Sequence, residues 1–225
     1  MMEIILLVIA YFLGSIPTGY LVGRRANIDI LKQGSGSTGA ANVWRIIGKV
    51  EGSFVFTIDF IKGFTAILLM QSVNELKIIS KISDISSVML NFQALHEWFV
   101  VGAAFLVTLG HSYSCWINFK GGKSAATGLG VLLVLNWMVA LGAFGLWLAT
   151  VVMWRTTSIS SMLVAIAIPI LMIFTHSPST YTFITFVLSI LVIYRHRSNL
   201  DRLRQGTEPK ITFFEIEQYE GLSEN

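Results

Sequence analysis

Charged residues and cysteine are scarce in this chain of 225 residues. Asp, Glu, Lys and Arg make up 13% of it, against about 25% in an ordinary soluble domain. Cys115 is the single cysteine, so a disulfide within one chain is excluded. A net charge of +3 is too small to indicate nucleic acid as a partner. What remains is apolar, with 54% hydrophobic residues and a mean hydropathy of +0.68, so we expect a lipid bilayer as the solvent.

Apolar runs of the length that crosses a bilayer, roughly 17 to 25 residues, recur along the chain. They are residues 3–23, 53–71, 98–116, 137–154, 158–175 and 180–194. A further run, 124–135, is too short to span comfortably unless protein surrounds it. The sequence therefore predicts an all-α, polytopic membrane helix bundle with about seven transmembrane helices. The number falls to five if two of the apolar runs do not cross.

Basic residues predict how these helices are oriented. Most Lys and Arg residues fall in three segments between apolar runs, at 24–49, 120–123 and 195–210. The positive-inside rule places such segments on the cytoplasmic side. We therefore expect the N-terminus outside and the C-terminus in the cytoplasm. Residues 1–206 are expected to form one transmembrane domain, and residues 207–225 an acidic cytoplasmic tail.

The first basic segment contains a glycine-rich stretch suited to binding an anion. Gly34, Gly36 and Gly39 expose backbone N–H groups, and Arg45 can grip phosphate with two parallel hydrogen bonds. The same glycines spell GxGxxG, the pattern of a dinucleotide-binding turn. That turn must follow a β-strand, whereas this stretch follows an apolar run of membrane-helix length. A phosphate-bearing ligand is favoured over a dinucleotide.

The second segment, FKGGKSAATG at 119–128, places two lysines around a double-glycine turn at a predicted helix start. Lys120 and Lys123 would supply positive charge to a phosphate group. The segment is not a P-loop, because the glycine that such a loop needs is replaced by Ile117.

The third segment, at 194–210, holds side chains that can move a proton or orient an oxygen. His196 titrates near neutral pH, Asn199 can bond an ester or phosphate oxygen, and Glu208 supplies a carboxylate. His196 and Asp201 also spell HxxxxD, a catalytic pair of another acyltransferase class. The partner motif of that class is absent, so we interpret this spelling as chance.

Charged and polar residues also occur within the apolar runs. Asp59 and Lys62 lie one helical turn apart, which predicts an ion pair at membrane depth. His111 ends the third run just before the lysine and glycine segment. It is expected either to orient that segment or to cap its helix.

In this order, the polar segments resemble the motifs of the bacterial acyl-phosphate:glycerol-3-phosphate acyltransferases, a family of small integral membrane enzymes. The resemblance extends from Gly14 to Lys210. The matching stretches are GSIPTGYL at 14–21, GSGSTGAANVWRIIGKVEG at 34–52, Asp59 with Lys62 and Gly63, GHSYSCWINFKGGKSAAT at 110–127, and HRSNLDRLRQGTEPK at 196–210.

Four positions depart from the family pattern. Ser37 replaces an asparagine, Ala41 a threonine, Ser114 a proline and Ser124 a glycine. Ser37 and Ser124 keep a polar group but change its reach.

The resemblance implies transfer of a fatty acyl group from acyl phosphate to the 1-hydroxyl of glycerol 3-phosphate, the first acylation of phospholipid synthesis. The products are lysophosphatidic acid and phosphate, and no metal, cofactor, coenzyme A or acyl carrier protein is expected. The resemblance also implies a multi-pass protein of the bacterial inner membrane, with its active site at the cytoplasmic face. We expect a functional link to an enzyme that forms acyl phosphate.

The resemblance assigns catalysis to Ser35, His196 and Asn199. The base is either His196 or a phosphate oxygen of the substrate itself. The expected substrate-binding residues are Gly34, Gly36, Ser37, Asn42, Arg45, Lys120, Gly121, Gly122, Lys123, Ser124 and Glu208. The alternative function is a transporter or flippase for a phosphorylated metabolite, although no duplicated half is visible in the sequence.

Overall fold

The computed structural model describes the backbone of residues 1–80 and 86–211, and the side chains of residues 1–73 and 94–211. These residues form helices, with one isolated β-bridge between Ser114 and Lys120 and no longer strand among them. The helices are α1 (Met2–Ser15), α2 (Thr18–Arg25), α3 (Ala40–Ile46), α4 (Lys49–Ser80), α5 (Ser86–Ser112), η1 (Cys115–Ile117), α6 (Ala125–Leu135), α7 (Trp137–Trp154), α8 (Thr157–Phe174), α9 (Ser179–Arg195) and α10 (Arg197–Arg204).

The helices confirm the prediction of an all-α membrane bundle. Within the described chain, five are long and apolar enough to cross a bilayer, with α1 and α2 taken together as one of them. The others are α4, α5, α7 and α8, whereas α6 and α9 are apolar but shorter. The number of crossings and the sidedness of the termini therefore stay predictions. The third apolar run ends earlier than expected, because α5 stops at Ser112.

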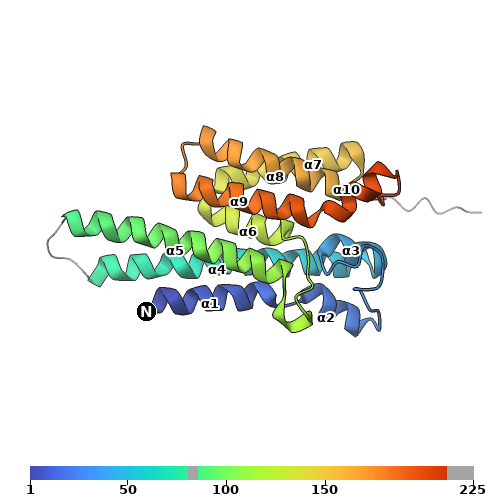
Figure 1. Ribbon diagram of the computed structural model, residues 1–225, viewed down its shortest axis with the longest axis horizontal. Helices are drawn as coiled ribbons and strands as arrows, with labels where there is room; N and C mark the ends of the chain where they lie inside the picture. Colours follow the sequence, from blue (N-terminus) through green and yellow to red (C-terminus); the bar gives the residue numbers. More distant parts are fainter. Residues whose placement is uncertain (81–85, 212–225) are drawn as a thin grey trace, which may run out of the picture.

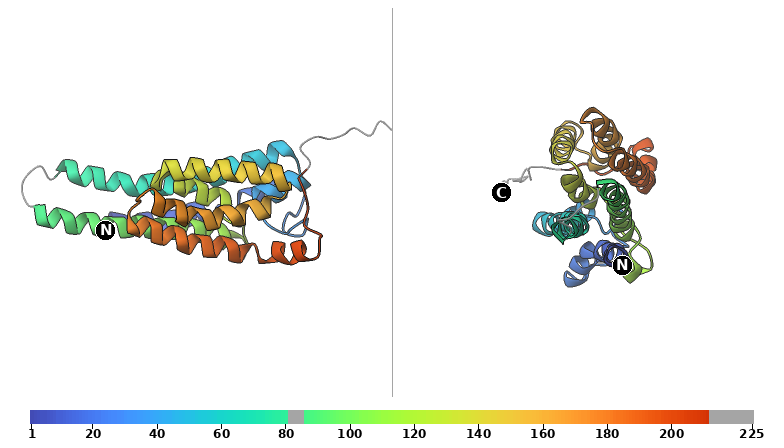
Figure 2. Two further views of the ribbon diagram at one scale, coloured as in Figure 1. Left: turned by 90° about the horizontal axis from the view of Figure 1, so that it is seen from above. Right: turned by 90° about the vertical axis from the view of Figure 1, so that its left-hand side faces the viewer.

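The bundle has two groups of helices with α6 between them. Figures 1 and 2 show α1, α4 and α5 on one side and α7, α8 and α9 on the other. Helix α6 packs directly on α4, and glycines let the two backbones touch. A Cβ atom at Gly63 would lie 2.1 Å from the Thr127 carbonyl oxygen, and one at Gly130 would lie 2.1 Å from that of Phe60. Larger residues at these two positions would push α6 away from α4.

The first apolar run is broken, contrary to the single helix expected over residues 3–23. Helix α1 ends at Ser15 and α2 begins at Thr18. Pro17 has no N–H to donate and disfavours a helical conformation at Ile16. The carbonyl of Ile16 consequently makes no i to i+4 helical bond. It accepts from Thr18 N at 3.0 Å, and Lys62 Nζ donates to the same oxygen at 2.5 Å. Lys62 Nζ also lies 2.7 Å from Asp59 Oδ1, which confirms the predicted ion pair.

The three polar segments meet at one end of the bundle. Figure 1 shows α2, α3 and α10 at the end away from the N-terminus. Asn136 reverses the chain between α6 and α7, and its side chain accepts a hydrogen bond from Val139 N at 3.1 Å. The turn from α6 into α7 returns the chain to this end, where α7 finishes at Trp154.

Candidate active site

A cavity of about 540 Å³ opens at this end and extends between α6, α7, α8 and α9. Most of its wall is apolar. Its polar residues include a group at the end where the three polar segments meet, together with hydroxyl residues of α4, α8 and α9. The polar residues at that end that the sequence predicts as site residues are Ser37, Arg45, Lys123, Ser124, His196 and Asn199. These six residues come from three segments far apart in the chain, so the fold brings the predicted motifs together.

Lys123, Asn199 and Glu208 form a continuous hydrogen-bonded chain. Lys123 Nζ donates to Asn199 Oδ1 at 2.6 Å, and Asn199 Nδ2 donates to Glu208 Oε1 at 2.6 Å. Glu208 also accepts from Ser158 Oγ at 2.8 Å and from Arg202 Nε at 2.8 Å. Glu208 therefore anchors Asn199, which in turn holds the lysine.

The surroundings of Glu208 and Lys123 set their protonation states. Burial alone would raise the pKa of Glu208, but hydrogen bonds from Asn199, Ser158 and Arg202 outweigh burial and lower it, so the carboxylate stays charged. Burial, followed by the positive charge of Arg202, lowers the pKa of Lys123 to about 8. Lys123 is a cation at neutral pH and contacts a neutral amide, so its charge remains available to an anion.

His196 is a neutral imidazole with a defined tautomer. Its Nδ1 lies 2.7 Å from the carbonyl oxygen of Val192. Since a carbonyl oxygen only accepts, Nδ1 carries the proton and Nε2 is left as an acceptor. Burial and the nearby charge of Lys123 lower the pKa of His196 to about 4. At neutral pH the ring is therefore unprotonated, with a lone pair on Nε2, and it is a weaker base than an ordinary histidine.

The glycine-rich loop is organised by Asn42 from within. Its side chain accepts from Ser35 N at 2.9 Å and donates to the carbonyl oxygens of Ser37 at 2.9 Å and Gln33 at 3.1 Å. Gly34 and Gly36 have φ angles of +57° and +65°, which favour glycine. The amide of Asn42 is thus engaged by the loop, and the lining of the cavity does not include it.

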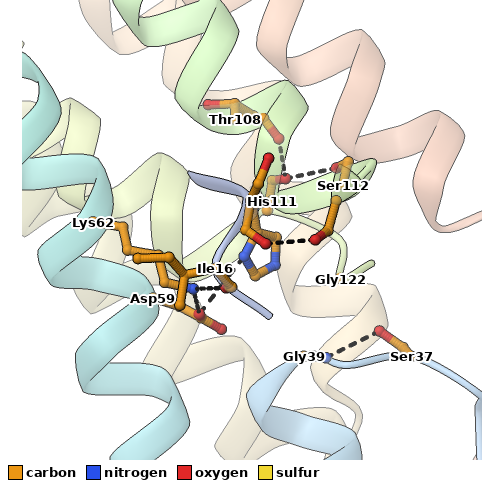
Figure 3. Close-up of polar contacts among 12 residues, drawn as sticks. Ile16, Ser37, Gly39, Asp59, Lys62, Thr108, His111, Ser112 and Gly122 are labelled. Atoms are coloured by element: carbon orange, nitrogen blue, oxygen red, sulfur yellow. Dashed lines mark hydrogen bonds and ion pairs between the residues drawn. The ribbon is translucent and has the colours of Figure 1, made fainter. Parts of the chain in front are cut away.

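Arg45 of this segment offers polar groups to a ligand, whereas Ser35 is not part of the cavity lining. The hydroxyl of Ser35 is buried and has no hydrogen-bond partner among the described residues. Arg45 lines the cavity, and its Nε donates to the Ala41 carbonyl at 2.9 Å, which fixes the guanidinium relative to α3. Ser37 Oγ accepts from Gly39 N at 3.2 Å and so shapes the start of α3 (Figure 3).

The double-glycine turn before α6 packs tightly on the end of α5. Gly122 N donates to the carbonyl of His111 at 3.1 Å, and a Cβ atom at Gly122 would lie 2.0 Å from His111 Nε2. Figure 3 shows His111 between Gly122 and Asp59, whose Oδ1 is 3.7 Å from His111 Nδ1. Of the two roles considered for His111, the contacts favour orientation of the turn. Lys120 is exposed and lies outside the cavity.

Ser124 occupies a backbone conformation that suits glycine. Its φ is +61°, so the glycine of the family pattern has a conformational reason. The serine hydroxyl compensates with hydrogen bonds, at 2.7 Å to Ser112 Oγ and at 2.9 Å to the carbonyl of Thr108. Figure 3 shows Ser112 and Thr108 beside this turn.

Two residues of the site escaped the sequence analysis. Arg202 was visible as a basic residue three positions after Asn199, but its role as a partner of Glu208 was not. Ser158 gave no specific signal, because it is one of five hydroxyl residues between Thr156 and Ser161. Glu208 itself is buried although it lies in the predicted tail, and residues 212–225 of that tail lie outside the described residues.

The sequence and the fold are both similar to those of known proteins. The sequence profile of the glycerol-3-phosphate acyltransferase family matches residues 4–206. A glycerol-3-phosphate acyltransferase of a Nostoc species is 44% identical over 204 residues, which cover 90% of this chain and 89% of the relative. The enzyme of Crocosphaera subtropica is 43% identical over 208 residues, or 92% of this chain and 93% of the relative.

Solved structures agree with these relatives. The chain superimposes with a TM-score of 0.81 on the glycerol 3-phosphate form of PlsY, an integral membrane glycerol 3-phosphate acyltransferase. Identity is 31%, and the match covers 94% of this chain and 96% of that one. The TM-score with the lysophosphatidic acid form is 0.78. An acyltransferase, rather than the alternative transporter, is the function these relatives support. The chain belongs to the glycerol-3-phosphate acyltransferase family.

Proposed function

We propose that the cavity binds glycerol 3-phosphate and acyl phosphate, and that it transfers the acyl group to the 1-hydroxyl of glycerol 3-phosphate. The observation that carries this proposal is the polarity of the cavity. Its polar end holds Lys123 and Arg45, and the rest of its wall is mostly apolar, with a few hydroxyl groups such as those of Thr185 and Ser189. Two substrates that carry phosphate, one of them with a hydrocarbon chain, match this division.

The polar end supports phosphate binding by Arg45 and Lys123. Lys123 is already oriented by Asn199 and does not contact a carboxylate directly. The unpartnered hydroxyl of Ser35 is suited to bond a substrate oxygen in the loop that Asn42 shapes. In this proposal Asn42 holds the loop instead of touching substrate, and exposed Lys120 contributes only long-range charge.

The apolar wall supports binding of the acyl chain. Helix α6 runs along the cavity from Ala125 to Leu135, a length of about 15 Å at 1.5 Å per residue. Gly128 lines this stretch, and a Cβ atom added there would meet no atom within 4 Å. The space beside Gly128 is therefore open and continuous with the polar end.

The chemistry follows from this arrangement. The 1-hydroxyl oxygen of glycerol 3-phosphate attacks the carbonyl carbon of acyl phosphate, a new ester C–O bond forms, and the bond from that carbon to the phosphate oxygen breaks. Phosphate leaves with the electron pair, and Lys123 and Arg45 stabilise its charge. The hydroxyl proton goes to His196 Nε2 or to a phosphate oxygen of the substrate. No serine nucleophile is required, because the donor already carries a good leaving group.

The setting of the reaction is part of the proposal. The positive-inside rule supports the cytoplasmic face of a bacterial inner membrane for the polar end. A donor that carries its own phosphate makes coenzyme A and acyl carrier protein unnecessary. A second enzyme that forms acyl phosphate would have to supply this substrate.

A reconstitution experiment tests the proposal. Purified protein in lipid, given acyl phosphate and glycerol 3-phosphate alone, should release lysophosphatidic acid and phosphate in equal amounts. The Lys123→Met variant should lose most of this activity. If product forms only after acyl coenzyme A is supplied, acyl phosphate is not the donor. Uptake of glycerol 3-phosphate into sealed vesicles without acylated product would support a transporter instead.

The base is tested separately. His196→Gln keeps a hydrogen-bonding group but accepts no proton. If His196 is the base, this variant and His196→Ala should both lose turnover. Retained turnover in His196→Gln alone would assign the base to the substrate phosphate and leave His196 a positioning role.

A further inference from the structure

Arg195 makes contacts that its place in the sequence does not suggest. It ends α9 directly before His196, among basic residues that mark the predicted cytoplasmic side. Its side chain is half-buried and contacts the turn before α6. Nη2 donates to the carbonyl oxygens of Gly122 at 3.0 Å and Gly121 at 3.2 Å, and Nε donates to that of Gly122 at 3.2 Å.

The guanidinium is held from a second direction by an aromatic ring. Its carbon atom lies 4.8 Å from the centroid of the Tyr113 ring, within the range of a cation–π contact. The main chain of Tyr113 is tied in turn to α1, because Tyr11 Oη donates to the Tyr113 carbonyl at 3.0 Å. The Tyr113 ring therefore restrains the orientation of the Arg195 guanidinium independently of its hydrogen bonds to the glycine carbonyls.

The two carbonyls that Arg195 binds belong to the residues immediately before Lys123. Two glycines in succession have wide backbone freedom, so this turn needs restraint from outside. His111 supplies it on one side by accepting from Gly122 N. Arg195 supplies the restraint on the other side by donating to the two glycine carbonyls, so the turn is held between α5 and α9.

We propose that Arg195 is a positioning residue that sets Lys123 relative to His196 through the carbonyls of Gly121 and Gly122. It does not touch substrate. Because Arg195 and His196 are consecutive, the end of α9 fixes the position of Lys123 relative to His196. Asn199 adds a second connection by bonding the Lys123 side chain. The inference rests on the proposed function, in which Lys123 binds phosphate.

The chain offers a matched control at Arg197. This residue is exposed, donates from Nη1 to the Tyr194 carbonyl at 3.3 Å, and lies 4.5 Å from the Tyr194 ring centroid. It has the same charge and the same kinds of contact as Arg195, but both contacts are with Tyr194 in the last turn of α9 and neither reaches the turn before Lys123. A role in topology or in contact with lipid headgroups would apply equally to both arginines.

The experiment compares Arg195→Lys, Arg195→Ala and Arg197→Ala in the reconstituted enzyme. We expect both Arg195 variants to lose at least tenfold in kcat/KM, because lysine keeps the charge but cannot bind both carbonyls with a planar fork. Arg197→Ala should stay within twofold of wild type. The melting temperature of each variant in detergent separates loss of positioning from loss of fold, and Arg195→Lys decides the matter if Arg195→Ala does not fold.

A pH profile gives a readout that a purely structural residue would not move. The charges of Arg202, Glu208, Arg45 and Arg195 all act on Lys123, and that of Arg195 lowers its pKa. Arg195→Ala should therefore move the alkaline limb of kcat/KM to higher pH, whereas Arg195→Lys should leave it in place while lowering the plateau.

Two results would overturn the inference: wild-type kcat/KM in Arg195→Lys, or equal losses in Arg195→Ala and Arg197→Ala. Both results differ from a failure of the proposed function. If the proposed function fails, the wild-type enzyme itself forms no lysophosphatidic acid from acyl phosphate, and the variants have no activity to compare.

Discussion

Lys123 Nζ lies 2.6 Å from Asn199 Oδ1, although 76 positions separate the two residues in the chain. The contact joins the start of α6 to α10, the two elements that carry the second and third polar segments. Because the partner is a neutral amide, the lysine is oriented without losing its charge. This relationship is the basis for proposing that the polar end of the cavity binds an anion.

Replacing Asn199 with Asp should weaken binding of glycerol 3-phosphate. The new carboxylate would pair with Lys123 and would lie against Glu208, whose hydrogen bond from Nδ2 would be lost. A charge-assisted hydrogen bond contributes about 1.5–3 kcal/mol, so we expect KM to rise about tenfold to a hundredfold. Steady-state kinetics checks this. Ser198→Asp adds the same charge at an exposed position of α10 and should change KM little.

The pH dependence should show a fall of kcat/KM above about pH 8. Lys123, with its pKa lowered to about 8 by burial, must be protonated to bind phosphate, and it loses that proton as the pH rises. His196, with a pKa of about 4, is neutral throughout this range.

Lys123→Arg provides the control for the pH profile. Arginine remains charged, so the alkaline limb should disappear in this variant, whereas ionisation of the substrates is the same for both enzymes. An alkaline limb at the same pH in Lys123→Arg would assign the titration to another group.

Ser124 variants should differ in stability in an unusual order. Ser124→Ala removes two hydrogen bonds and keeps the left-handed backbone, which should destabilise the protein by about 1–2 kcal/mol and lower the melting temperature by about 5 °C. Ser124→Gly loses the same bonds but relieves about 1 kcal/mol of backbone strain. Glycine should therefore melt close to wild type in detergent. A glycine variant less stable than the alanine variant would contradict this account.

A larger side chain at Gly128 should shorten the acyl chains that the enzyme accepts. The position faces open cavity and a Cβ atom there meets no atom within 4 Å, so Gly128→Leu should fill space that the hydrocarbon needs. Competition between donors of different length should show a loss of kcat/KM for long chains of tenfold or more, and little loss for short ones. Gly145→Leu is the control, since Gly145 is exposed on α7 and outside the cavity lining. Equal losses for all lengths would place the acyl chain elsewhere.

Some residues could be assigned to a role from the sequence because local rules suffice for them. The spacing of Asp59 and Lys62 on one helix face predicts their ion pair, and the structure confirms it. Other assignments depended on distant partners. The sequence grouped Asn42 with residues that bind substrate, whereas the fold uses its amide to hold the loop. In the sequence Arg195 is one basic residue among several, and only the structure shows that it contacts Gly121 and Gly122.

The amino-acid sequence by itself determined the class of this protein. Long apolar runs require helices in a bilayer, because lipid leaves backbone polar groups no other partner, and the order of polar motifs identifies the family. Only the tertiary structure decided which polar groups meet. Each of Lys123, His196 and Asn199 could face lipid, solvent or protein by its local pattern alone. Their convergence depends on the close packing of α6 on α4 and on the contacts of Arg195 and Asn199 with the turn before α6, and such contacts join residues far apart in the chain.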